Sequence, residues 1–245
     1  MTSVYGKIQN LITAANTVTG ESDTTLTDAV QTLIDGYGQG GGGWTTDGIA
    51  DKSEPNGAIT ITTAVSSIKE RAFLNCRGIT SLTVEGSPYI ENYAFSGCTG
   101  LTAINAPNWT RLYSNNYNAS SYKFSGCTGL TSISFPAYGN YAIPSYAFQN
   151  CSNLTIADFG GGSGLQNSFQ GCSSLRTLVL RRTGSITTLS AWSANTLGGI
   201  YQNPAASTIY VPSALISSYQ TASNWSSAYA AGVTFAAIEG SQYEL

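Results

Sequence analysis

The sequence contains no histidine and very little charge. Its 245 residues include 10 lysines and arginines against 13 aspartates and glutamates, so charged side chains make up only 9% of the chain and the formal net charge is -3. Without histidine, a serine or cysteine nucleophile lacks its usual base, and a zinc site lacks one of its usual ligands. With so few cations, the chain lacks the clustered positive charge that binds nucleic acid or an anionic membrane. Neither partner is therefore expected.

Carboxylates are equally sparse in the middle of the chain. Between residues 92 and 237, Asp158 is the only acidic residue, whereas glycoside hydrolysis needs two carboxyl groups roughly 5 to 10 Å apart. The three glutamates just upstream are interpreted as solvated loop charges. The glycine-rich "FGGGSG" at 159–164 is not followed by the Gly-Lys-Ser/Thr of a phosphate-binding loop, and it is expected to be a return loop. We therefore expect no enzyme, no cofactor and no metal.

The sequence also lacks long apolar runs, since no stretch is apolar enough to span a membrane. Its first residues, "MTSVYGKIQN", do not show a basic segment followed by an apolar run, so no secretory signal is expected. A sortase-type anchor is not expected either. These features argue against an ordinary exported surface protein and favour release by another route, such as assembly into a virion.

What the chain does contain is a repeated phrase. "AFLNCRGITSLTV" begins at Ala72, and four related segments follow it: "AFSGCTGLTAIN", "KFSGCTGLTSISF", "AFQNCSNLTIADF" and "SFQGCSSLRTLVL". Each of the five cysteines stands three residues after a phenylalanine and three before a leucine or isoleucine, and neighbouring cysteines are 21 to 29 residues apart. A phrase that returns at this spacing indicates stacked repeats, each of which buries its apolar edge against its neighbours.

The spacing within the phrase predicts its local structure. Phe95, Cys98 and Leu101 follow one another at intervals of three, which places them on one side of a helical turn. Beyond them the period changes to two, as at 133–135, where apolar and polar residues alternate as in a short half-buried strand. Each repeat is expected to be a turn of helix leading into a strand, with the strands stacked in parallel into one narrow sheet. The fold class is an α/β solenoid.

The cysteines occupy one structural position in every repeat. Free cysteine packs as a small apolar residue, and apolar surroundings raise the pKa of a thiol and lower its reactivity. We therefore expect reduced, buried thiols that serve as core residues. A disulfide between neighbouring repeats is the alternative, but an odd number of equivalent cysteines is not the framework of a disulfide-linked domain. A metal site is disfavoured because no Cys-x-x-Cys pair occurs.

The phrase "YAFSGCTGLTAI", together with "IYVPSALISSYQTASNWS" near the end of the chain, resembles the BspA-like leucine-rich repeat family, the Treponema-type repeat. The resemblance extends from about Ile59 to Ile238. It implies a right-handed solenoid with a parallel β-sheet and no catalytic residue, and members of the family occur among bacterial surface proteins, adhesins and phage-encoded proteins. One departure is the 29-residue interval between Cys98 and Cys127, which leaves "NWTRLYSNNYNASSY" as an enlarged loop.

The rest of the chain does not repeat. Apolar residues at helical spacing lie on both sides of "ESDTT" near the start, which predicts a small N-terminal helical hairpin. In the last part of the chain, a helix is expected at 213–223 and a final strand at 233–238, which would cover the open edge of the sheet. The expected parts are a helical hairpin attachment element at 1–38, a glycine-rich linker and lead-in at 39–58, the solenoid at 59–212 and a C-terminal cap at 213–245.

The N-terminal hairpin carries a second resemblance. "LITAANTVTGESDTTLTDAVQTLIDGYG" is similar to short helical segments that begin many tail-associated proteins of phages and prophages of Gram-positive bacteria. This implies a virion tail protein for host recognition, with other tail proteins and a host cell-surface glycan or protein as partners, and with homo-oligomerisation as an option. The alternatives are a BspA-type adhesin on the bacterial cell surface and a virion decoration protein with a purely structural role. The segment itself could instead be a solubility or dimerisation element.

The enlarged loop is the candidate ligand site. Its aromatic and amide side chains suit a sugar ring: Trp109, Tyr113, Asn115, Asn116, Tyr117 and Tyr122. A surface built from serine, threonine, asparagine, glycine and tyrosine favours neutral hydrogen-bonding ligands. The alternative is that Trp109 and one or two of the tyrosines pack the loop onto the flank of the solenoid. The outward strand positions Ser132, Ser134 and Asp158 are the next candidates.

Overall fold

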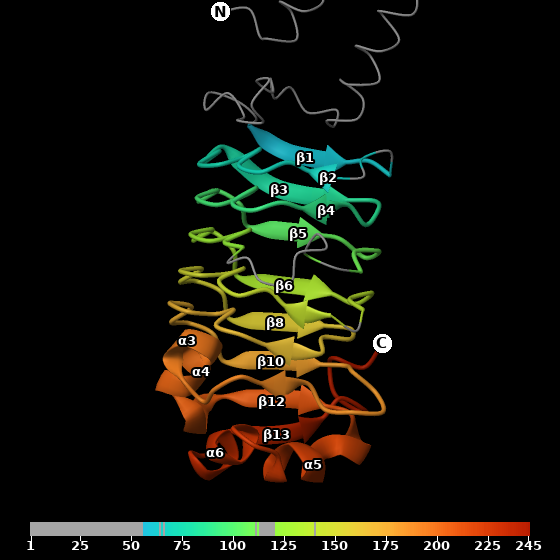
Figure 1. Ribbon diagram of the computed structural model, residues 1–245, viewed down its shortest axis with the longest axis vertical. Helices are drawn as coiled ribbons and strands as arrows, with labels where there is room; N and C mark the ends of the chain where they lie inside the picture. The colour runs from blue at the N-terminus through green and yellow to red at the C-terminus, as the bar shows by residue number, and fades with distance from the viewer. Residues whose placement is uncertain (1–55, 64, 66, 111, 113–120, 140) are drawn as a thin grey trace, which may run out of the picture.

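The chain forms one elongated stack of short coils (Figure 1). The computed structural model describes residues 56–63, 65, 67–110, 112, 121–139 and 141–245. Strand β1 lies at one end of the stack, and the C-terminal helices lie at the other. The hairpin expected at 1–38 and most of the linker expected at 39–58 lie outside the described residues, as does 113–120 of the enlarged loop.

Long parallel strands form one side of the stack. The first sheet contains β1 (Gly57–Ile61), β3 (Ile79–Val84) and β5 (Ala103–Asn105), and the second contains β6 (Ser132–Phe135), β8 (Ile156–Phe159), β10 (Thr177–Leu180), β12 (Thr208–Val211) and β13 (Thr234–Ala237). Equivalent positions of successive repeats face each other, as Leu82 faces Ile104 and Leu178 faces Ala157. The expectation of one continuous sheet is wrong for the described strands. The division falls between the three-residue β5 and β6, which are neighbours in the stack but do not pair as strands.

A second set of strands, each only two residues long, lies on the return segments. They are β2 (Ser67–Ile68), β4 (Tyr89–Ile90), β7 (Ala142–Ile143), β9 (Gly164–Leu165) and β11 (Thr188–Leu189). Strand β2 pairs with β4, and β9 pairs with both β7 and β11, in every case in parallel. Most coils therefore pair with a neighbour on two sides, which satisfies backbone hydrogen-bonding groups on the return segments as well.

The repeated phrase forms the core between these two sets of strands. Its phenylalanine rings stack from one turn to the next, with centroid separations of 4.8, 5.3, 5.6 and 5.7 Å: Phe73, Phe95, Phe124, Phe148 and Phe169. Each of these rings is at most 3% exposed, and burying one such side chain contributes about 1.5 to 3 kcal/mol. The five cysteines beside them are free and buried, which confirms the expectation of reduced core thiols.

Helices close the C-terminal end of the stack. They are α3 (Ala194–Leu197), α4 (Gly199–Gln202), 3-10 turns at Pro204–Ala206 and Ser213–Leu215, α5 (Ile216–Thr221) and α6 (Trp225–Ala230). Tyr219 and Trp225 are completely buried, and their ring centroids lie 5.5 Å apart. The helix expected at 213–223 appears as a 3-10 turn followed by α5, and the expected last strand is β13. No helix of the described residues is both long and apolar enough to cross a membrane.

Candidate recognition surface

The turns that carry the repeated phrase line up along one edge of the stack, here called the turn rim (residues 71–76, 93–98, 122–127, 146–151 and 167–172). The first residue of each turn has a left-handed backbone, with φ angles of 58°, 58°, 31°, 61° and 49°: Arg71, Tyr93, Tyr122, Tyr146 and Asn167. Asparagine tolerates this conformation, whereas a bulky residue adopts it at a cost of about 1 to 2 kcal/mol. Three successive repeats nevertheless have tyrosine there, so contacts of the ring must offset the cost.

The three tyrosines form a tyrosine ladder. The rings of Tyr93 and Tyr122 are stacked with centroids 4.9 Å apart and planes 6° apart, and those of Tyr122 and Tyr146 with centroids 5.0 Å apart and planes 7° apart. The Arg71 guanidinium lies 5.7 Å from the centroid of the Tyr93 ring, where it makes a cation–π contact. All three rings are half-buried, so the ladder remains partly accessible from solvent.

A row of side-chain hydrogen bonds runs beside the tyrosine ladder. The Ser125 hydroxyl donates to Gln149 Oε1 at 3.4 Å, and Gln149 Nε2 donates to Gln170 Oε1. Gln170 Nε2 in turn donates to Asn195 Oδ1 on α3 at 2.9 Å. A carboxamide has two N–H donors and an oxygen with two lone pairs, so each of these amides keeps capacity for a ligand. The turn rim therefore combines accessible aromatic rings with neutral donors and acceptors.

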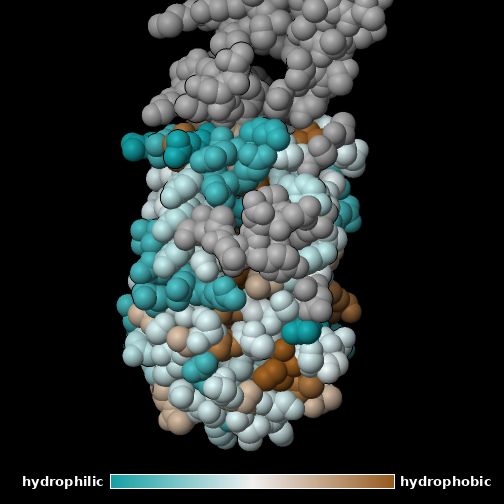
Figure 2. All heavy atoms as spheres, viewed as in Figure 1, coloured by the Kyte–Doolittle hydropathy of each residue, from teal (hydrophilic) through white to brown (hydrophobic). Residues whose placement is uncertain are grey.

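From its second turn (93–98) onward, the chemistry of this rim suits an uncharged partner. On the face drawn in Figure 2, strongly hydrophilic side chains gather over the N-terminal half of the described solenoid, and the C-terminal half is nearly neutral in colour with small apolar patches. The exposed ion pairs also lie in the first repeats, where Lys69 meets Glu91 at 3.0 Å and Arg71 meets Glu70 at 3.6 Å. Aromatic rings with few rotatable bonds, flanked by amides, bind sugars or protein surfaces at low entropic cost.

The structure separates the residues that were expected to form a ligand site. Trp109 is completely buried, its Nε1 donates to the Pro88 carbonyl at 2.9 Å, and its ring meets Phe124 and Phe135 edge to face with centroids 6.2 and 5.7 Å away. Such a placement leaves no face for a ligand, so the alternative expectation, that Trp109 packs onto the solenoid, describes this residue. Tyr122 belongs to the tyrosine ladder. Four further candidates lie outside the described residues: Tyr113, Asn115, Asn116 and Tyr117.

Of the outward strand positions, Ser132 and Ser134 are exposed as expected, whereas Asp158 is not. Asp158 on β8 is only 8% exposed, because the Arg181 side chain folds over it and donates from Nε and Nη2 to both carboxylate oxygens at 2.8 and 2.9 Å. The Ser134 hydroxyl lies 3.5 Å from the same carboxylate. This bidentate pair leaves little of the Asp158 charge available to a partner. No sequence pattern indicated that Arg181 would bind Asp158 from the end of the neighbouring strand.

Lys123 is a second feature that sequence reasoning missed. It stands where the other repeats have alanine or serine, yet it is 2% exposed, and its Nζ donates to the Ile90 carbonyl at 2.6 Å. Burial lowers the pKa of this ammonium to about 8, although the Glu91 charge partly opposes the change. The signal was visible in "KFSGC", where a lysine replaces the small residue before phenylalanine.

Glu91 is a partly exposed carboxylate of the first repeats that accepts three hydrogen bonds. Burial raises its pKa, but hydrogen bonds from Lys69, from the Glu70 amide and from the Ser67 hydroxyl outweigh burial and hold the pKa below its usual value. No group of three or more histidine, cysteine, aspartate or glutamate side chains that could hold a metal ion occurs in the part of the chain that the structure describes.

A match to a protein family supports the repeat architecture. The family described as "BspA type Leucine rich repeat region" matches in six copies at residues 55–155 and 110–211, which together span more than half of the chain. A crystal structure of a leucine-rich repeat protein from T. pallidum matches with 18% sequence identity and a TM-score of 0.33, covering 61% of this chain and 83% of that one. Among curated protein sequences, none matches.

Proposed function

Since the chain belongs to the BspA-type leucine-rich repeat family, we propose that its solenoid is a recognition module that binds an uncharged cell-surface partner, a glycan or a protein, through the turn rim. The observation that carries the proposal is the tyrosine ladder. Three stacked, half-buried rings occupy left-handed positions where the neighbouring repeat accepts asparagine, and a row of neutral amides runs beside them. This surface can hold flat apolar faces and hydroxyl groups at once.

Two settings are compatible with such a module. The first is a bacterial cell-surface adhesin, which the family match favours. The second is a phage or prophage tail-associated protein that presents the solenoid to the host, and its support is the similarity of the segment at 11–38, outside the described residues, to the start of tail proteins. Removal of residues 1–43 distinguishes them. If the protein belongs to a virion, the truncated chain should fold but should no longer be incorporated into particles. If it is a cell-surface adhesin, the full-length chain should not associate with particles, and the deletion should change nothing in that assay.

The experiment that tests recognition uses asparagine in place of the three ladder tyrosines. Tyr93→Asn, Tyr122→Asn and Tyr146→Asn together remove the rings while giving each left-handed position a residue that tolerates it. Binding to glycan arrays and to whole bacterial cells should fall by at least about tenfold, because interface aromatics commonly contribute a kcal/mol or more each. Tyr229→Asn, which removes a 49% exposed tyrosine from α6, is the matched control and should bind normally. Unchanged binding by a folded triple variant would refute a role for the turn rim.

A further inference from the structure

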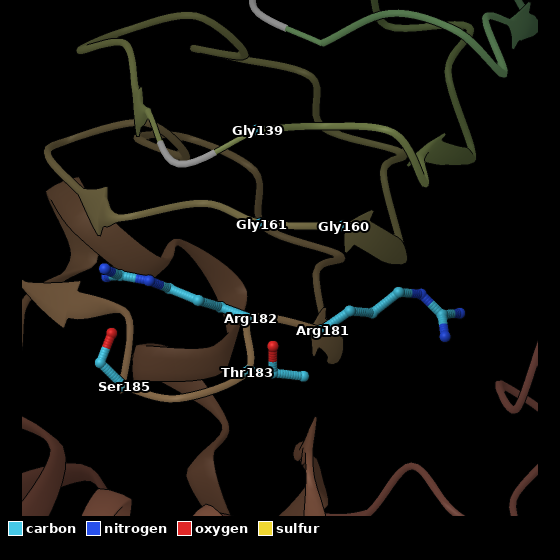
Figure 3. Close-up of a pocket in the computed structure, with 7 residues that line it drawn as sticks. All are labelled: Gly139, Gly160, Gly161, Arg181, Arg182, Thr183 and Ser185. Carbon is cyan, nitrogen blue, oxygen red and sulfur yellow. The ribbon is translucent and has the colours of Figure 1, made fainter.

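The edge opposite the turn rim is where the long strands end (Figure 1). It carries a hollow whose lining differs chemically from the turn rim (Figure 3). Its volume is about 300 Å³, and it is open to solvent. Glycines from two successive coils form one wall, and the segment after β10 forms the other: Gly139, Gly160 and Gly161 against Arg182, Thr183 and Ser185. This edge is called the return rim here. It includes the glycine-rich "FGGGSG" segment at 159–164, which the proposed function does not use.

The glycines are required by the close approach of successive return loops. A Cβ atom on Gly160 would lie 1.9 Å from the Pro136 carbonyl oxygen, and one on Gly161 would lie 2.3 Å from the Tyr138 carbonyl oxygen. Consequently no side chain from these positions can fill the hollow, and its wall is main chain. The Gly160 amide donates to Phe135, whereas the amides of Gly161 and Thr183 donate to no acceptor among the described residues.

Positive charge lies at the same place. Arg181 is neutralised by Asp158 on one side of the hollow. Arg182 points to the other side (Figure 3), where its Nη1 donates to the Ile186 carbonyl at 3.1 Å and to the Ser163 carbonyl at 3.5 Å. Neither its Nε nor its Nη2 donates to a described residue, and it forms no ion pair within the described part of the chain. The half-buried Arg182 cation therefore has no counter-charge among the residues that the structure describes.

We propose that the hollow on the return rim binds a tetrahedral oxyanion, the phosphate or sulfate group of a larger ligand. The amides of Gly161 and Thr183, which have no acceptor among the described residues, and the hydroxyl groups of the walls are donors that suit the oxygens of such a group. The Arg182 guanidinium at the side of the hollow adds positive charge, and its Nε–H and Nη2–H groups are further donors for phosphate or sulfate oxygens. The site is independent of the turn rim: it lies on the other edge, and it takes a charged group rather than a neutral one.

The test is a titration of the full chain with inorganic phosphate, with sulfate, and with chloride at matched ionic strength. The readout is the NMR chemical shift of the backbone amides of Gly161 and Thr183. Phosphate or sulfate should move both resonances saturably, and chloride should not. Arg182→Gln should weaken the affinity for phosphate by at least about tenfold, which corresponds to the loss of one charge-assisted hydrogen bond. Arg77→Gln, which removes an exposed arginine of the first repeat, is the matched control and should leave the response unchanged.

Further arms separate the possible outcomes. A glycerol-phosphate polymer that binds more tightly than free phosphate identifies a polymer-borne group as the ligand, and equal affinity identifies the free ion. Binding should weaken with rising salt, because a partly exposed cation in an open hollow is screened. Shifts that do not saturate, that chloride reproduces, or that persist in a folded Arg182→Gln protein would overturn the proposal. The turn-rim variants should bind phosphate normally, so failure here and failure of the proposed recognition function are distinguishable.

Discussion

The Sγ atom of Cys127 lies 3.1 Å from the carbonyl oxygen of Phe95 in the preceding repeat, and donates to it. The same contact recurs along the stack, with Cys98 donating to Phe73 at 3.1 Å, Cys151 to Phe124 at 3.1 Å and Cys172 to Phe148 at 2.9 Å. The thiol is therefore more than a small apolar filler. It connects each turn to the previous one at the point where the phenylalanine rings stack.

Substitutions at this position and at the adjacent ring should differ in cost. Cys127→Ala should lower the free energy of unfolding by about 1 to 2 kcal/mol, because a weak hydrogen bond and the packing of one sulfur atom are lost while the Cys98 amide still donates to Phe95. Phe124→Ala should cost about 3 to 5 kcal/mol, since it removes a ring stacked on both faces. Chemical denaturation under reducing conditions measures both values.

Thiol chemistry gives an independent check of the same arrangement. Burial raises the pKa of the Cys127 and Cys151 thiols above the usual value, and neutral buried thiols react slowly. Titration of the native protein with a thiol reagent should therefore modify few cysteines, and titration after unfolding should modify all five. Rapid modification of all five in the folded protein would contradict the buried position of the cysteines.

Much of this core was predictable from the sequence. The spacing of phenylalanine, cysteine and leucine is set by one turn of backbone, so residues such as Phe95, Cys98 and Leu101 had to share a buried side. The alternation that follows them identified the long strands for the same reason. The thiol hydrogen bond was not predictable, because it depends on how closely one turn approaches the next.

The candidate site was harder to predict, because side-chain direction there depends on contacts between repeats. The composition of the enlarged loop suggested that Trp109 faces a ligand, but the ring fills a space between Phe124 and Phe135 that only the stacked coils create. Tyrosine before the phrase was visible in three repeats, at Tyr93, Tyr122 and Tyr146. Its left-handed backbone and its stacking could not be deduced from that periodicity alone.

The buried Lys123 should make stability depend on pH in a recognisable way. Its pKa is about 8 in the folded protein and about 10.4 in an unfolded chain. Between these values the unfolded state holds a proton that the folded state has released, so the free energy of unfolding rises with pH, by up to roughly 3 kcal/mol. The raised thiol pKa values act in the opposite direction above about pH 9, where unfolded thiols lose protons. Stability should therefore be greatest between about pH 8 and 9.

Lys123→Met isolates this contribution. The variant keeps a long side chain in the same space but cannot titrate, so the rise in stability between about pH 7.5 and 8.5 should disappear while the decline above pH 9 stays. Urea denaturation at a series of pH values, with the thiols kept reduced, measures the slope. An equal slope in both proteins would show that Lys123 does not titrate in this range.

Asp158 and Arg181 should show strong energetic coupling. Both side chains are 11% exposed, and two hydrogen bonds join them. Either single substitution, Asp158→Asn or Arg181→Gln, leaves the other charge poorly solvated, whereas the double variant removes both charges together. A double-mutant cycle should give a coupling free energy of about 1 to 3 kcal/mol. Additive losses of stability would mean that the two side chains are independent in solution.

The tyrosine ladder predicts an order of stability among its own variants. Tyr122 stacks on both Tyr93 and Tyr146, whereas Tyr146 stacks only on Tyr122 among the three. Each stacked pair contributes about 0.5 to 1.5 kcal/mol, and asparagine relieves about 1 kcal/mol of left-handed backbone strain at either position. Tyr146→Asn should therefore be nearly neutral, and Tyr122→Asn should destabilise the protein by about 1 kcal/mol more.

Thermal and urea denaturation of the two variants measure this difference, with Tyr122→Phe as the control that keeps the ring and removes only the hydroxyl group. Tyr122→Phe should retain the full stacking contribution and lose the stabilisation of any hydrogen bond made by the phenol. If Tyr146→Asn were the more damaging of the two asparagine variants, ring stacking within the ladder would not explain the order of stability. The rings would then be held chiefly by contacts outside the ladder, and their availability to a ligand on the turn rim would have to be rejected.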